Sequence, residues 1–168
     1  MPNNPNDFDL RIPVKSIHSQ RGISLIEVLL SVCIITVILI MATRYFYTAS
    51  NNQRINHTVS EIASVVIALQ NWDQGNSDFS GLANNGILNL YQAGFLPLTN
   101  DLEVTEGNDD TTAVLNNAWT LPITVVGQTG SATISTGFNN AANCAAVQAH
   151  FVNSQCDANY QFTYVVQE

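Results

Sequence analysis

Glycine and proline are missing from residues 23–74, the interval between Gly22 and Gly75. A helix interior tolerates both poorly: glycine costs about 1 kcal/mol relative to alanine and proline about 3 kcal/mol. Their absence over so long a stretch predicts one long helix.

Positive charge is scarce. No lysine follows Lys15. Residues 23–168 contain two basic residues, Arg44 and Arg54, and eleven acidic ones, which gives a formal charge of 2 − 11 = −9. Proteins that bind nucleic acid gain affinity by neutralising phosphates with lysine and arginine. We therefore expect no nucleic-acid partner.

Recognisable catalytic motifs are also lacking. The chain has no H-E-x-x-H, no glycine-rich phosphate loop and no G-x-S-x-G. The sequence therefore predicts no enzymatic activity, no catalytic residues and no cofactor.

Cysteine occurs three times. Cys33 lies in an apolar run, where we expect a small buried hydrophobe. Cys144 and Cys156 lie near the C-terminus and predict one disulfide if the compartment is oxidising. A metal site built from this pair and His150 would want more ligands, so we expect none.

One apolar run, Ile23 to Ala42, is long enough to cross a bilayer of about 30 Å, and it carries a single charge, Glu27. A charge at the bilayer centre costs about 2.5–3.5 kcal/mol on insertion scales. The basic residues before the run predict a cytoplasmic N-terminus and an outward-facing segment 43–168; they are Arg11, Lys15 and Arg21.

The segment "RGISLIEVLLSVCIITVILI" resembles the N-terminus of a type IV prepilin. Arg21 is the basic residue, Gly22 precedes the cleavage point, Ile23 is the apolar first mature residue and Glu27 is the fifth. An uninterrupted apolar helix follows. The long leader and the initial isoleucine resemble the type IVb subclass.

This resemblance implies that a prepilin peptidase cuts between Gly22 and Ile23 and N-methylates Ile23. Cleavage would create an ammonium group, largely protonated at neutral pH because an α-amino pKa is about 7.7–8. In a filament of identical helices, Glu27 of one subunit would pair with the terminal amine of its neighbour. An unpaired buried carboxylate would be costly, so this pairing would set the register.

The expected architecture is α+β, the type IV pilin fold: a long N-terminal helix whose amphipathic half packs on a C-terminal antiparallel β-sheet, with a disulfide-closed C-terminal region. The expected segments are a leader (1–22), a hydrophobic transmembrane and assembly helix (23–44), its amphipathic half (45–74), an αβ-loop region with a short helix (75–118), and a sheet with a D-region helix and the disulfide (119–168).

Apolar residues in the amphipathic half recur at spacings of 4, 3, 4 and 3, which predicts one buried stripe; they are Ile55, Val59, Ile62, Val66 and Leu69. The pattern lasts about two heptads, too few for a coiled coil. We therefore expect the stripe to pack on the chain's own globular domain.

Shorter elements follow. Residues 84–97 predict a helix ended by Gly94, with Ile87, Leu88, Tyr91 and Phe95 facing inward. Strands are expected at 119–127, with an edge or irregular start at Pro122, and at 131–137 and 160–166. A hairpin turn is expected at 127–130. A helix is expected at 139–154, packing through Val147 and Phe151.

Residues 99–112 are acidic and predict a solvated surface loop. Calcium binding stays an alternative, because clustered carboxylates suit that ion; the candidate ligands are Asp101, Glu103, Glu106, Asp109 and Asp110. His57 and His150 are expected at the surface or half-buried.

The leading hypothesis is a structural subunit of a type IV pilus, of the IVb kind, that serves adhesion, bundling, motility or conjugation. Its partners would be further copies in a helical filament, a prepilin peptidase and the inner-membrane assembly machinery. The precursor would lie in the bacterial inner membrane with a periplasmic C-terminal domain, and the assembled pilus would be extracellular. The alternatives are a minor pilin or type II secretion pseudopilin and, from another class, a single-span sensor or binding protein.

Overall fold

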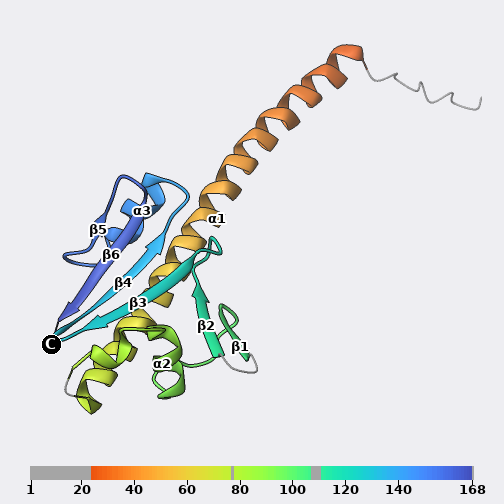
Figure 1. Ribbon diagram of the computed structural model, residues 1–168. Coiled ribbons are helices and arrows are strands. Elements are labelled where there is room, and N and C mark those ends of the chain that lie inside the picture. The colour runs from red at the N-terminus through yellow and green to blue at the C-terminus, as the bar shows by residue number, and fades with distance from the viewer. Residues whose placement is uncertain (1–23, 77, 107–110, 168) are drawn as a thin grey trace, which may run out of the picture. The chain divides into compact units, whose positions relative to one another are not determined.

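A computed structural model describes residues 24–76, 78–106 and 111–167. The fold is α+β, as predicted: a long helix α1 (Leu25–Gly75) precedes a six-stranded antiparallel sheet (Figure 1). The chain divides into two compact units at Thr43 and Arg44, and the two are described separately below.

The second unit contains the C-terminal half of α1, which buries one face in the domain's own core. The fully buried positions are Thr58, Ile62, Val65, Ala68 and Leu69. The predicted stripe residues Ile55, Val59 and Val66 flank this line and are half-buried. The expectation that the stripe packs within the chain is confirmed, although its centre lies slightly to one side of the predicted line.

The sheet has the strand order β1-β2-β3-β4-β6-β5, with every neighbouring pair antiparallel. Its strands are β1 (Leu102–Glu106), β2 (Thr111–Asn116), β3 (Pro122–Gln128), β4 (Ser131–Gly137), β5 (Gln155–Cys156) and β6 (Gln161–Gln167). The three predicted strands correspond to β3, β4 and β6. The predicted hairpin turn joins β3 to β4, and Gly130 there adopts φ +77°, which glycine does without strain.

The acidic segment 99–112 is not wholly a loop, and that expectation was wrong. Residues 102–106 form β1, and residues 111 and 112 begin β2. Leu102 is buried while Glu103 and Thr105 are exposed, so the polar residues belong to the solvent-facing side of an edge strand. Asp109 and Asp110 lie outside the described residues.

Two α-helices, each shorter than predicted, and one 3₁₀ turn (Ser80–Leu82) accompany the sheet. Helix α2 (Gly86–Gln92) stops before Gly94, whose φ of +78° breaks the helix as expected. Helix α3 (Ala141–Gln148) begins where the Asn140 side chain accepts a hydrogen bond from the Asn143 N–H, and it lies beside β5 and β6 (Figure 1). After Gln148 the chain continues in turns, and Asn153 adopts a φ of +66°, in the left-handed region.

Most inward positions of these helices were predicted correctly. Ile87, Leu88 and Val147 are buried, whereas Tyr91 and Phe95 are half-buried against the core. Phe151, beyond the end of α3, is also half-buried and packs its ring against those of Phe162 and Tyr164.

A buried asparagine organises the crossing from β2 to β3. The Asn117 side chain donates to the Thr136 hydroxyl and the Gly137 carbonyl, both at 2.9 Å. The side-chain oxygen of Asn117, Oδ1, accepts hydrogen bonds from the backbone N–H groups of Trp119 and Leu121, at 2.9 and 3.1 Å. One side chain therefore satisfies four polar groups at a point where backbone pairing is interrupted.

Replacing Asn117 with alanine should lower the free energy of unfolding by about 3 kcal/mol, because two backbone N–H groups lose their acceptor in a buried site. Denaturant unfolding of the full chain in detergent micelles would measure the change. The matched variant Asn56→Ala, at an exposed position of α1, should change stability by less than about 0.5 kcal/mol. Equal stability of the two variants would contradict the role given to Asn117.

Candidate functional site

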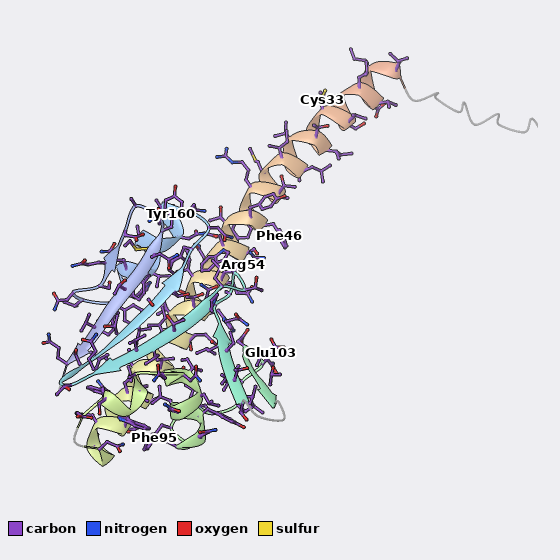
Figure 2. All side chains as sticks on the ribbon, viewed as in Figure 1. Cys33, Phe46, Arg54, Phe95, Glu103 and Tyr160 are labelled. Carbon is purple, nitrogen blue, oxygen red and sulfur yellow. A yellow bond between two sulfur atoms is a disulfide. The ribbon has the colours of Figure 1, made fainter. Side chains whose placement is uncertain are left out.

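The first unit presents an apolar helix with no buried residue. Every described position from Ser24 to Thr43 is exposed, and an 18-residue window reaches a mean hydropathy of 2.9. Figure 2 shows the side chains around Cys33 projecting from all sides of the helix. A helix of this length and composition is able to cross a membrane, so this segment is compatible with a membrane anchor.

Glu27 lies in the first turn of this helix, with its side chain exposed among apolar neighbours. The N–H groups of Glu27 and Val28 donate to the Ser24 carbonyl at 2.9 and 3.2 Å, so the helical hydrogen bonding begins at Ser24. No described residue donates a hydrogen bond to the Glu27 carboxylate. Gly22 and Ile23, the predicted cleavage pair, lie outside the described residues.

The hydroxyl groups of this helix are satisfied within it. Ser31 donates to the Glu27 carbonyl at 2.9 Å, Thr36 to the Val32 carbonyl at 2.7 Å, and Thr43 to the Leu39 carbonyl at 3.0 Å. Glu27 is the one charged side chain among the described residues 24–43.

Cys33 differs from its prediction. The sequence placed it as a buried hydrophobe, but its side chain is exposed on the apolar helix. Here the run has no protein partner among the described residues, so its small side chains face outward with the large ones.

Three aromatic residues directly follow the apolar run and were missed by the sequence analysis. Tyr45, Phe46 and Tyr47 are 78%, 70% and 74% exposed. Next to Arg44, they have the composition that membrane proteins place at the membrane–water interface. The signal was present in the sequence as "RYFY", adjacent to the end of the hydrophobic stretch.

The predicted disulfide joins Cys144 to Cys156, with their Cα atoms 6.1 Å apart. It connects α3 to the short edge strand β5. Asn143, next to Cys144, accepts a hydrogen bond from the Asn51 side chain at 3.1 Å, which ties α3 to α1. His150 is exposed, as predicted, and the disulfide removes both sulfurs as metal ligands.

A second polar group lies on the amphipathic half of α1. His57 Nε2 is 3.4 Å from Asp101 Oδ2, and Glu61 lies one helical turn after His57. Burial, followed by the nearby charge of Asp101, raises the pKa of Glu61 from 4.5 to about 7, while His57 opposes the shift. His57 is exposed as predicted, but the sequence analysis did not connect these three residues.

Removing the disulfide by the paired changes Cys144→Ser and Cys156→Ser should destabilise the second unit by about 3 kcal/mol, because the unfolded chain regains the entropy of a closed loop. Denaturant unfolding of the oxidised full chain in detergent would measure this. Cys33→Ser, at an exposed position, is the matched control and should leave stability unchanged. A reductant that leaves the unfolding midpoint unaltered would contradict the prediction.

The raised pKa of Glu61 predicts a pH-dependent stability. A carboxyl group whose pKa is higher in the folded state stabilises the fold below pH 4.5, and this contribution is lost as the pH rises through about 7. Glu61→Gln should therefore be more stable than the parent above pH 7, by about 1 kcal/mol after allowance for solvent screening, and close to it near pH 4.5.

Thermal unfolding of the full chain with a chelator present, at several pH values, would test this expectation. Glu103→Gln, on the exposed side of β1, is the matched control and should follow the parent at every pH. A Glu61→Gln curve parallel to the parent across the whole range would exclude an unusual titration at Glu61.

Comparisons with known proteins identified no relative of this chain. No family model, no curated protein and no solved structure matches the chain.

Proposed function

We propose that this chain is the precursor of a structural subunit of a type IV pilus, resembling the type IVb pilins. A prepilin peptidase removes residues 1–22 and methylates Ile23, and the mature subunit then polymerises into an extracellular filament. The supporting observation is the fully exposed apolar helix that carries one carboxylate, Glu27, near its start.

The exposed apolar helix supports polymerisation because it needs a cover in both of its expected environments. Before assembly, lipid covers the large side chains of residues 25–41. After assembly, identical helices from neighbouring subunits take the place of lipid. The apolar contacts are non-directional and set no register by themselves.

Glu27 supplies the directional contact. In the filament interior, its carboxylate would be buried and would need a cation. The described residues 24–43 contain no lysine, arginine or histidine, so the counter-charge must come from another group. The terminal ammonium created at Ile23 of an adjoining subunit meets that need, and one pairing then fixes the axial position of the incoming subunit.

The disulfide-closed domain fits the outer layer of such a filament. Its cross-link requires an oxidising compartment, which agrees with a C-terminal domain on the periplasmic side and later outside the cell. The aromatic residues Tyr45, Phe46 and Tyr47 would mark the boundary between the inner membrane and the periplasm in the precursor.

Glu27→Ala should insert into the inner membrane normally and fail to form filaments. Loss of one partner of a buried ion pair costs about 3–5 kcal/mol, which corresponds to a weakening of subunit addition of more than about a hundredfold. Electron microscopy of sheared filaments, with immunoblots of membranes as the insertion control, would measure both. Glu103→Ala, on the exposed face of β1, should assemble normally.

Intact-mass measurement of the membrane-bound and sheared protein separates this proposal from its alternatives. Loss of residues 1–22 with one added methyl group supports a pilin, and dominance in sheared filaments supports the major subunit over a minor one. A full-length chain in the membrane, or abundant filaments from Glu27→Ala, would overturn the proposal.

A further inference from the structure

The second unit brings a nitrogen ligand and two carboxylates to one point. The potential ligand atoms of His57, Glu61 and Asp101 all lie within 4.8 Å of one another. His57 and Glu61 are four residues apart, so they lie on the same face of α1. Asp101 comes from the segment between α2 and β1, 40 residues further along the chain than Glu61.

The backbone around the three residues is fixed by other contacts. The Asp101 carbonyl accepts a hydrogen bond from the Asn116 N–H at 2.9 Å, and the adjacent Leu102 is buried in the core. On the helix, the Thr58 hydroxyl beside His57 accepts from the Ala118 N–H at 3.2 Å. The two contacts tie the β1 segment and the helix to residues 116 and 118, at and just after the end of β2, independently of the charged groups.

Among the described residues, the two carboxylates of the cluster have no potential counter-charge other than His57. One carboxylate oxygen of Glu61, Oε2, is buried and has no hydrogen-bond partner among the described residues. The neighbouring carboxylate of Asp101 is itself an acceptor when ionised, so it satisfies Oε2 only by sharing a proton. No arginine or lysine in the described part of the chain forms an ion pair with Glu61 or Asp101.

We propose that His57, Glu61 and Asp101 form a binding site for a divalent transition-metal ion, with zinc as the best-matched ion. The metal would satisfy the unpartnered oxygen of Glu61 and offset the two carboxylates. It would also join α1 to the start of β1. The fourth position would be open to water, because the His57 side chain is 46% exposed.

The donor set and spacing favour zinc over calcium or magnesium. Zinc combines imidazole nitrogen with carboxylate oxygen at about 2.0–2.2 Å, and adjacent ligands of such a tetrahedron lie about 3.4 Å apart. The His57–Asp101 separation of 3.4 Å matches that edge, and the potential ligand atoms of all three residues lie within 4.8 Å of one another. Calcium takes six to eight oxygen ligands and magnesium keeps near-octahedral oxygen geometry, so an imidazole and two carboxylates suit neither.

Calorimetric titration of zinc chloride into the metal-free full chain in detergent would test the site. We expect one ion per chain, and a loss of affinity of at least about tenfold in each of His57→Ala, Glu61→Gln and Asp101→Asn. His150→Ala is the matched control and should bind zinc as the parent does, because His150 is an exposed histidine within the loop closed by the Cys144–Cys156 disulfide. Excess calcium or magnesium should not displace the zinc.

Cobalt(II) serves as a second probe, because its visible absorption reports four-coordinate binding directly. The parent should develop this absorption, and His57→Ala should not. Circular dichroism of each variant, with a chelator present, checks that the fold is retained. The absence of zinc binding by the parent, or zinc binding unchanged in folded His57→Ala, would overturn the proposal and would leave a shared proton as the group that satisfies Glu61.

Discussion

Burial of one face of the C-terminal half of α1 is the contact on which the second unit depends. Ile62, Val65 and Leu69 are fully buried in one core with residues from the sheet and from the segment after the helix, including Phe162, Ile134 and Leu82. Most of the stability of a helix in a protein comes from tertiary packing of its amphipathic face, so packing in this core stabilises the C-terminal half of α1. The same contact places His57 and Glu61 next to β1.

Much of the fold could be predicted from periodicity and from missing residues. The long helix followed from the gap between Gly22 and Gly75, and three strands followed from β-branched runs bounded by turns. Strand β1 was missed because its segment is acidic, so composition concealed the alternation of buried Leu102 with exposed Glu103. Helix α3 was predicted too long because the sequence alone does not show that turns begin directly after Gln148.

The candidate sites divide in the same way. The disulfide was predictable because it follows from the number and position of the cysteines outside the apolar run. The role of Glu27 stays a prediction that rests on a local sequence pattern. The grouping of His57 with Glu61 and Asp101 was not predictable, because it needs the register between a helix and a strand far along the chain. Asp101 had been considered as a calcium ligand within its own acidic segment, whereas its nearest charged neighbours come from α1.

The hydroxyl groups of the apolar helix have one further consequence. The hydroxyl groups of Ser31, Thr36 and Thr43 each donate a hydrogen bond to a backbone carbonyl one turn earlier. None of them therefore needs a hydrogen-bond acceptor outside the helix. The segment can exchange one surrounding for another, acyl chains for other helices, with its internal bonding intact. Among the described residues 24–43, Glu27 is the one charged side chain, so any such exchange of surroundings would cost free energy mainly at its carboxylate.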